Sequence, residues 1–426
     1  MKRVVVTGIG SVSPLGNSFE RAWAAIKAGE AGISQITRLD SSGLPWRIAG
    51  ELKDFDETER FSAKEINRLD PFVLYAVAAA AMALEDAGLI EKLEAKSQKS
   101  EVRTKRTLSG SPGYLPSAGV IIGSSRGGIC TIEKALIRCG EQKPRLGQCR
   151  VSPYLMPSTT ISMAASYVTQ RLGIRGHCLG ISNACASGAN AIGEAFRTIK
   201  SGHSELIIAG GAEAPICRLC LEGYGASGAL SRKVKAVPRP FDRDRDGFVL
   251  SEGACLLVLE DYEKATKRGA TIYGEVVGYG NTSDAFHVTQ PHPQGESEAI
   301  ELALKEAGLG PDDVDYINAH GTGTKIGDAA EAGAIRAAFG KRGSTIPVSA
   351  IKSMTGHMLA ASGAFEIAST LKSIREGIIP PTINLDNRDA SCDINIVTEK
   401  TKADIDIAVS NSFGFGGVNA VIALKK

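Results

Sequence analysis

Short β-branched apolar runs that end in glycine recur along the chain. They are RVVVTGIG (3–10), AGVIIGSS (118–125), ELIIAGGAE (205–213) and GEVVGYG (274–280). Continuous apolar runs of this length are typical of buried strands, and glycine allows the chain to turn tightly after them. Longer stretches with a helical pattern lie between them, at residues 71–89 and 296–309. The alternation predicts an α/β fold whose sheets are covered by helices.

An internal repeat organises this pattern. Residues 186–202, ASGANAIGEAFRTIKSG, align without a gap to residues 361–377, ASGAFEIASTLKSIREG, an offset of 175 residues. Their flanks agree too, because VVVTGIG resembles EVVGYG and SELIIAGG resembles DIDIAVSN. We therefore expect two copies of one α/β unit, over residues 1–265 and 266–426. The alternative is a chance likeness of two helices rich in small residues.

Composition narrows the class of protein. The 426 residues are 43% hydrophobic and 23% charged, as in a globular protein with more than one core. A net charge of +2 excludes a strongly positive surface of the kind that binds nucleic acid or an anionic membrane over the whole protein. The chain contains no apolar run long enough to span a bilayer and no signal-peptide pattern. Its nine scattered cysteines then favour a reducing, cytoplasmic location.

Several weak motifs predict neither a cofactor nor a metal. Cys217 and Cys220 form a lone CxxC without a second ligand pair. VTGIGSVSPLG (6–16) lacks the GxGxxG spacing of a dinucleotide site, and arginines interrupt the calcium-like DRDRDGFVLSEG (242–253). Residues 95–117 are polar and carry glycine, proline and serine, so a surface loop is expected there.

Cys185 is the candidate nucleophile. In ISNACASGANAIGEAF it stands where a strand-like run meets a helix that opens with small residues. Backbone N–H groups at a helix N-terminus lower a thiol pKa and can bind an oxyanion, so we expect a lowered pKa for Cys185. Ala360 holds the matching position of the second copy. A buried structural cysteine is the alternative interpretation.

Two of the six histidines follow strand-like runs in segments rich in Gly, Ser and Thr. His320 lies in DYINAHGTGT and His357 in AIKSMTGHM, at strand ends where α/β proteins bind ligands. Lys352 and Glu366 flank His357, and such a pair near an imidazole can fix its charge. His287, in a polar stretch, could also reach a cleft. Hydrogen-bonded structural histidines are the alternative.

These motifs together resemble the β-ketoacyl-ACP synthase family, and its free-standing elongating (type II) members most. NACASG, AHGTGT, KSMTGH and NSFGFGGVN (411–419) occur in the family's order and approximate spacing, and RPFDRDRDGFVLSEGA (239–254) and PPTINLD (380–386) are similar too. The resemblance spans nearly the whole chain. It implies the thiolase fold, a duplicated α/β unit in five αβαβα layers.

The resemblance also implies an activity. Cys185 would accept an acyl group from acyl carrier protein (ACP), with the N–H groups of Cys185 and Phe415 as the oxyanion hole. His320 and His357 would then promote decarboxylation of malonyl-ACP and stabilise the enolate. Attack of this carbanion on the thioester would give a β-ketoacyl-ACP two carbons longer.

Further residues receive roles from the resemblance alone. Lys352 is similar to the lysine that supports the second catalytic histidine, and Glu366 to its carboxylate partner. Thr322 and Thr324 resemble residues beside the carrier arm. Phe415 resembles the gate residue of the glycine-rich loop, although a mobile glycine turn would explain the same sequence.

Three positions depart from the family pattern. Arg126, in GSSRGG, replaces a small or aliphatic residue at the expected floor of the acyl pocket, and Tyr224 stands where Phe is common. Asn183 replaces a Thr. Because burial of an unpaired charge is costly, Arg126 must turn to solvent or a carboxylate, pair within a dimer, or face a short, polar or anionic acyl group.

The pathway and the partners stay open at this stage. Fatty acid elongation is the first interpretation, and the alternative is a type II polyketide or polyene ketosynthase that works with a chain-length partner. We expect a homodimer, or a heterodimer with a homologous chain. ACP docking would use Lys64 and Arg68, with Arg232 and Lys233 near Gly228, where the family commonly has Arg. Ordinary solvated charges are the alternative.

Overall fold

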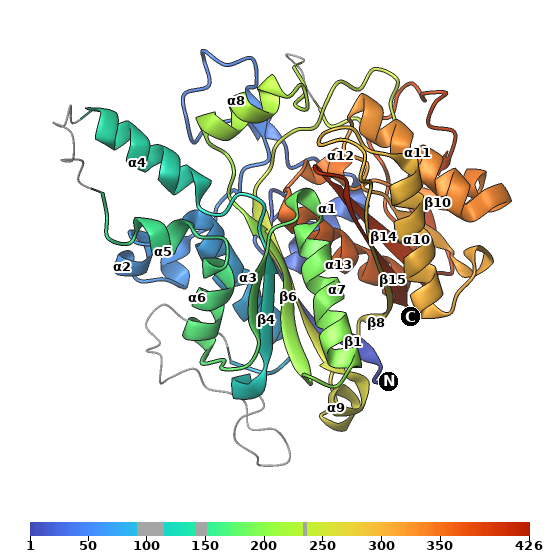
Figure 1. Ribbon diagram of the computed structural model, residues 1–426, viewed down its shortest axis with the longest axis horizontal. Coiled ribbons are helices and arrows are strands. Elements are labelled where there is room, and N and C mark those ends of the chain that lie inside the picture. The colour runs from blue at the N-terminus through green and yellow to red at the C-terminus, as the bar shows by residue number, and fades with distance from the viewer. Residues whose placement is uncertain (92–114, 142–150, 233–236) are drawn as a thin grey trace.

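One large sheet runs through the molecule. The computed structural model describes residues 1–91, 115–141, 151–232 and 237–426 (Figure 1), so most of the expected surface loop at 95–117 lies outside the described residues. The sheet of the described part has eleven strands in the order β12-β10-β9-β14-β15-β8-β1-β7-β6-β4-β5. No helix of this part is long and apolar enough to cross a membrane.

The sheet consists of two halves with one topology. The first half contains β1 (Val4–Val12), β4 (Gly119–Gly123), β5 (Cys178–Ile181), β6 (Leu206–Glu213) and β7 (Gly253–Asp261). The second contains β8 (Gly274–Ser283), β9 (Tyr316–Asn318), β10 (Pro347–Ser349), β14 (Ile407–Gly414) and β15 (Val418–Lys425), with β12 (Asn395–Ile396) at its edge.

The strand directions confirm the duplication. In the first half β4 pairs in parallel with β5 and β6, and β7 pairs antiparallel with β6 and β1. In the second half β9 pairs in parallel with β10 and β14, and β15 pairs antiparallel with β14 and β8. The matched flanks of the repeat fall on equivalent strands, β1 with β8 and β6 with β14. A short antiparallel contact, Val4–Val6 with Gly274–Val276, joins the halves. The unit boundary at residues 265 and 266 stays a prediction.

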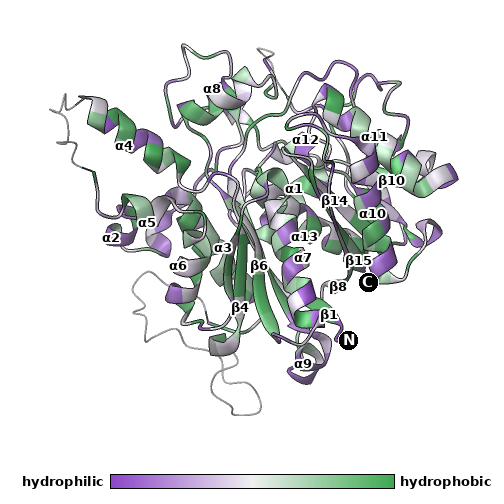
Figure 2. Cartoon of the chain, in the orientation of Figure 1, coloured by the Kyte–Doolittle hydropathy of each residue, from purple (hydrophilic) through white to green (hydrophobic). Residues whose placement is uncertain are grey.

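Helices complete five layers. The two repeat helices, α7 (Ser187–Lys200) and α13 (Ala360–Glu376), contact each other and strands of both half sheets. The outer faces are covered by α3 (Pro71–Asp86) and α6 (Met163–Leu172) on the first half, and by α10 (Pro293–Ala307) and α11 (Lys325–Phe339) on the second. In Figure 2, β4 and β6 are hydrophobic along their length, as expected for strands covered on both faces.

The remaining elements are short or peripheral. They are α1 (Phe19–Ala28), α2 (Ala63–Ile66), α4 (Ile129–Glu141), α5 (Leu155–Thr159), α8 (Arg218–Ala226), α9 (Tyr262–Lys267), α12 (Lys352–Thr355), and the strand pairs β2 (Ser34–Gln35) with β3 (Ile48–Ala49) and β11 (Ile378–Ile379) with β13 (Thr401–Lys402). Helix α4 extends away from the body and alternates hydrophobic and hydrophilic residues (Figures 1 and 2).

Glycines in the two first strands explain how closely the outer helices pack. A Cβ atom at these positions would strike a helix carbonyl oxygen: Gly8 and Gly10 of β1 against α3, and Gly278 and Gly280 of β8 against α10. In both halves, glycines in the first strand let the outer helix pack closely on the sheet. These glycines are the ones in the strand sequences VVVTGIG and EVVGYG.

Candidate active site

The turn before α7 presents Cys185. A 3₁₀ turn, Ala184–Ala186, precedes the helix, and Ala184 has a φ of 48°, in the left-handed region that is costly for a residue with a side chain. Ser187 holds this conformation, because its Oγ accepts the Asn183 N–H at 2.8 Å and donates to the Ala184 carbonyl at 2.6 Å. The half-buried Cys185 is thereby placed at a cavity.

A cavity of about 510 Å³ brings together most of the predicted site residues. Those that line it are Cys185, Tyr224, His287, His320, Thr322, Thr324, His357 and Phe415. The expectation that His287 reaches a cleft is therefore confirmed. Lys352 and Glu366 lie behind the cavity wall, and Arg126 contacts Tyr224.

His357 faces the thiol directly. Its Nε2 lies 3.0 Å from the Cys185 Sγ. On the other side of the ring, Nδ1 lies 3.2 Å from the Ser362 Oγ, which also accepts the Met358 N–H at 2.9 Å. With the Nδ1 hydrogen donated to Ser362, Nε2 is free to accept the thiol proton.

The prediction of a lowered thiol pKa is wrong for the resting site. Burial raises the pKa of Cys185 to about 11, and the opposing effects of the Lys352 and Arg126 charges and of the Phe415 N–H are smaller. The sulfur lies in an apolar cluster, which disfavours the thiolate more than the nearby helix end was expected to favour it. Cys185 therefore needs a base, and His357 is in place.

Lys352 supports His320, whereas the resemblance placed it behind His357. Its Nζ lies 3.2 Å from the His320 Nδ1, and donates to the His320 carbonyl at 2.6 Å and to the Glu366 Oε1 at 2.5 Å. The parallel pairing of β9 and β10 brings the start of α12 beside the loop after β9, which explains the difference. Because these bonds use all three ammonium hydrogens, the His320 Nδ1 must accept and its Nε2 carries a hydrogen.

A residue that sequence reasoning missed, Glu331, holds the loop that carries His320. Its carboxylate accepts the His320 N–H at 2.7 Å, the Gly321 N–H at 2.8 Å and the Asn411 side-chain amide at 3.0 Å. It is 1% exposed, which a carboxylate tolerates only with such partners. The one signal in the sequence that could have indicated a buried role for Glu331 was its position among the alanines of DAAEAGAI, where a solvated Glu is unexpected.

The two catalytic histidine candidates lie together and uncharged. Their ring centroids are 5.4 Å apart with the planes at 85°. Burial first, and then the charge of Lys352, hold the pKa of His320 and of His357 well below the usual value. Burial also raises the pKa of Glu366 to about 7. Both imidazoles are therefore neutral near pH 7 and available as hydrogen-bond donors and acceptors.

Phe415 lies in the tight turn between β14 and β15. Gly416 and Gly417 have φ values of 90° and 69°, which this turn requires. The Phe415 N–H points at the Cys185 sulfur, where it lowers the thiol pKa. Gly414 packs so closely on the backbone N atoms of the nucleophile turn that an added Cβ would lie 3.3 Å from that of Cys185. This packing brings the two predicted oxyanion donors together.

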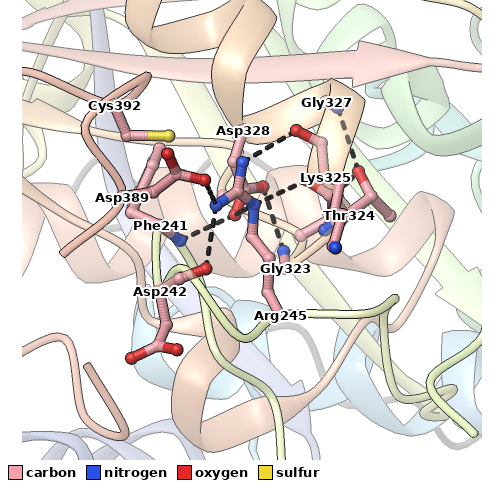
Figure 3. A network of polar contacts seen from close by, with 12 residues as sticks. Phe241, Asp242, Arg245, Gly323, Thr324, Lys325, Gly327, Asp328, Asp389 and Cys392 are labelled. Atoms are coloured by element: carbon pink, nitrogen blue, oxygen red, sulfur yellow. Dashed lines mark hydrogen bonds and ion pairs between the residues drawn. The ribbon is translucent and has the colours of Figure 1, made fainter. Parts of the chain in front are cut away.

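The two threonines stand at the start of α11. The Thr322 and Thr324 hydroxyls are 3.0 Å apart, and the Thr324 Oγ1 caps the helix by accepting the Gly327 N–H at 3.2 Å. Arg245, 2% exposed, anchors this segment: it donates to the Thr324 carbonyl at 3.1 Å and pairs with Asp328 at 3.4 Å (Figure 3).

The same network explains the calcium-like motif. Arg245 also pairs with Asp389 at 2.5 Å (Figure 3), and Asp242 accepts the backbone N–H groups of Asp244, Asp386 and Asn387, each at 2.8 Å. Within DRDRDG, Arg245 thus binds acids from outside the motif, and Asp242 binds backbone amides. These contacts fix the loop that backs the threonines.

Arg126 contacts Tyr224, which lines the cavity. The exposed Arg126 donates from Nε to the Tyr224 Oη at 2.7 Å, and its guanidinium lies 5.1 Å from the ring centroid. The buried Glu213, not singled out from the sequence, accepts the Arg126 N–H at 3.2 Å. Asn183 bonds to Asn190 at 3.1 Å, so its side chain points toward α7.

The predicted docking cations among the described residues, Lys64, Arg68 and Arg232, do not line the cavity. The Arg68 guanidinium stacks 4.2 Å from the ring of Tyr154, and that of Arg232 lies 5.9 Å from the ring of Trp46. Lys64 is exposed on α2, and Lys233 lies outside the described residues.

The CxxC cysteines are part of the core. Cys217 and Cys220 are buried with Cys130 in the apolar cluster that contains Tyr224. Cys139 is disulfide-bonded, which the expected reducing location did not predict.

Two family models match the chain. "Beta-ketoacyl synthase, N-terminal domain" matches residues 1–265, and "Beta-ketoacyl synthase, C-terminal domain" matches residues 273–386. The chain belongs to the β-ketoacyl synthase family. This synthase is 43% identical to "3-oxoacyl-[acyl-carrier-protein] synthase 2" of Synechocystis sp., over 100% of the chain and 98% of the relative. It is 42% identical to the Staphylococcus aureus protein of the same name, with the same coverage.

Solved structures agree with this membership. The synthase matches "The ishigamide ketosynthase/chain length factor" with a TM-score of 0.89 at 33% identity, covering 100% of this chain and 99% of that one. It matches the type II PKS ketosynthase of an acyl-carrier protein complex with a TM-score of 0.86 at 31% identity and the same coverage. The duplicated five-layer unit is therefore the thiolase fold, and the protein is a condensing acyltransferase, as the resemblance predicted.

Proposed function

We propose that this β-ketoacyl synthase transfers an acyl group from ACP to Cys185 and condenses it with malonyl-ACP in fatty acid biosynthesis. The observation that carries the proposal is the Cys185 Sγ at 3.0 Å from the His357 Nε2, with His320 beside them. Full-length relatives named 3-oxoacyl-[acyl-carrier-protein] synthase 2 support the same substrate class.

Acylation begins with the protonated thiol. As the Cys185 sulfur attacks the thioester carbonyl of acyl-ACP, its proton passes to the His357 Nε2. The oxyanion accepts hydrogen bonds from the N–H groups of Cys185 and Phe415. Collapse of the tetrahedral intermediate breaks the bond to the carrier's sulfur, which takes the proton from His357, and leaves the acyl group on Cys185.

Condensation uses both imidazoles as donors. The thioester oxygen of malonyl-ACP accepts hydrogen bonds from the Nε2 of His320 and of His357, while the bond to the carboxylate breaks and releases CO2. The enolate carbon attacks the acyl carbonyl, and the Cys185 thiolate leaves. Between the two half-reactions the His357 hydrogen moves from Nδ1 to Nε2 by proton exchange with solvent. The Ser362 hydroxyl, which can donate as well as accept, then donates to Nδ1.

The carrier arm would pass Thr322 and Thr324 at the rim of the cavity. Both hydroxyls line it, and the anchor provided by Arg245 keeps them in place. Lys64 and Arg68, on or beside the exposed α2, would meet the carrier protein.

The test is to trap the acyl enzyme. In a His320→Ala variant given a panel of acyl-ACPs and malonyl-ACP, intact-protein mass spectrometry should show an acyl adduct mapped to Cys185 and almost no condensed product. An exposed His203→Ala variant should turn over normally. If no acyl-ACP modifies Cys185 in either variant, the proposal is wrong.

A second candidate function is that of a type II polyketide or polyene ketosynthase. The polar pair Arg126 and Tyr224 favours it, because saturated chains need no such groups. Incubation with ACP and malonyl-ACP, with and without a chain-length partner chain, separates the two: products from the partner-dependent reaction alone would favour the second candidate.

Assembly with a second copy or a homologous chain is part of the proposal. The edge strand β5 exposes Leu179 (43%), and α4 exposes Leu136 (64%) and Ile137 (53%). An edge strand and exposed apolar side chains are features suited to pairing with another chain. Native mass spectrometry should give a dimer that Leu179→Lys weakens, and a wild-type monomer at micromolar concentration would contradict it.

A further inference from the structure

The loops that carry Arg126 and His320 are equivalent. Each follows the second strand of its half sheet, β4 or β9. In each, two consecutive backbone N–H groups donate to one buried carboxylate, Glu213 in the first loop and Glu331 in the second. The fold therefore holds the Arg126 loop by the same means that holds the loop of His320.

Arg126 and Tyr224 keep unused donors there. The Arg126 Nε donates to the Tyr224 Oη at 2.7 Å, so the phenolic hydrogen stays available. Among the described residues, neither this hydrogen nor the terminal guanidinium nitrogens of Arg126 have a hydrogen-bond acceptor, and Arg126 has no ion-pair partner. Tyr224 is 8% exposed and lines the same cavity as Cys185.

A saturated acyl chain would cover these donors without offering them an acceptor. Covering an unpaired donor is costly, whereas an acceptor oxygen would satisfy it, and a carboxylate would do so with the added strength of a charged pair. Burial raises the pKa of Glu213 to about 7, so this carboxyl is only partly ionised near pH 7. Glu213 therefore cancels the positive charge of Arg126 only in part. The Arg126 charge also acts on the Cys185 sulfur. Tyr224, which Arg126 contacts, lines the same cavity as Cys185.

We propose that Arg126 and Tyr224 form a polar subsite that selects short acyl groups bearing an oxygen acceptor, a terminal carboxylate above all. This inference rests on the proposed function of Cys185 and names its substrate class. Arg126 is the specificity-determining residue, and Tyr224 orients it.

The experiment compares three six-carbon acyl groups on ACP: hexanoyl, 3-oxohexanoyl and 5-carboxypentanoyl. The rate of Cys185 acylation is followed by intact-protein mass spectrometry. A charged hydrogen bond corresponds to about a tenfold preference for the carboxylate over hexanoyl in the wild type, with 3-oxohexanoyl between them. Arg126→Met should abolish the preference, and Tyr224→Phe should reduce it in part.

Arg218→Met is the matched control. This arginine lies on α8 with Tyr224 but pairs with Glu222 at the surface, so its loss should leave all three rates unchanged. Equal or faster acylation by hexanoyl in the wild type would overturn the subsite, as would an Arg126→Met variant that slows all three groups alike. Failure of all three groups to modify Cys185 would instead count against the proposed function.

Discussion

The turns that start the two central helices share one backbone geometry and differ in chemistry. Ala184 and Leu359, 175 residues apart as in the repeat, have φ values of 48° and 47°. The next residue is Cys185 in the first turn and Ala360 in the second. Cys185 opens onto the cavity, whereas Ala360 is fully buried, with its carbonyl packed where a Cβ of Gly188 would lie. The strained turn is thus a property of the fold, and one copy adds a thiol to it.

The ends of the fourth strands differ in the same way. β6 ends on Glu213, which fixes the Arg126 loop, whereas β14 ends on Gly414, which packs on the backbone of the nucleophile turn. Each half therefore supplies what the other lacks. A site of this kind needs both copies, because the thiol comes from the first and the histidines from the second.

The largest expected effect comes from making the two turns alike. Cys185→Ala should lower condensation by at least about 10³-fold, because it removes the covalent intermediate. The melting temperature should barely change, since alanine already occupies the equivalent turn. Product formation is measured by mass spectrometry with acyl-ACP and malonyl-ACP.

The reverse exchange is its control. In the doubly substituted Cys185→Ala, Ala360→Cys protein, the new thiol should not react with iodoacetamide while folded, because its site is closed. Rapid labelling there, or restored activity, would show that the second turn is as open as the first.

The next largest effect is expected on stability, at the contact between α7 and α13. Gly188→Ala should destabilise the protein by about 3 kcal/mol, because the added Cβ overlaps the Ala360 carbonyl oxygen. Gly223→Ala on α8 is the control, since nothing lies within 4 Å of its Cβ, and it should raise stability by up to about 1 kcal/mol. Urea unfolding measures both, and equal effects would mean that the helices can separate freely.

The smallest effect concerns Glu213. Its pKa is about 7 when folded, against 4.5 as the ordinary value, so the folded state binds more protons between these pH values. The wild-type free energy of unfolding therefore falls as pH rises through this window, by about 2 kcal/mol more than that of Glu213→Gln. Urea unfolding at pH 5 and pH 8 checks it, with the exposed Glu222→Gln as control. Parallel curves for wild type and Glu213→Gln would contradict the assignment.

Much of the fold, and the grouping of Cys185, His320 and His357 at one cavity, could be predicted from the sequence. Apolar runs and the gapless repeat indicated the duplicated unit, and the settings of Cys185, His320 and His357 indicated a shared site. The supporting contacts could not be predicted, because they join distant segments. Ser125 and Glu213, for example, are 88 residues apart. The same reason explains why Lys352 was assigned to His357, its neighbour in the sequence, although it contacts His320, which is 32 residues away.

The thiol pKa was missed for another physical reason. A helix start can be recognised in a sequence, but the cluster that desolvates the sulfur contains residues from several separate segments. The desolvation that raises the thiol pKa could therefore be recognised only from the folded structure.

Burial of Cys185 has a consequence for the lifetime of the enzyme. Peroxides attack thiolates, and a pKa of about 11 leaves roughly one thiol in ten thousand ionised at pH 7. Between turnovers the nucleophile is thus shielded from oxidation. Only a bound substrate that draws the proton onto His357 exposes its reactivity.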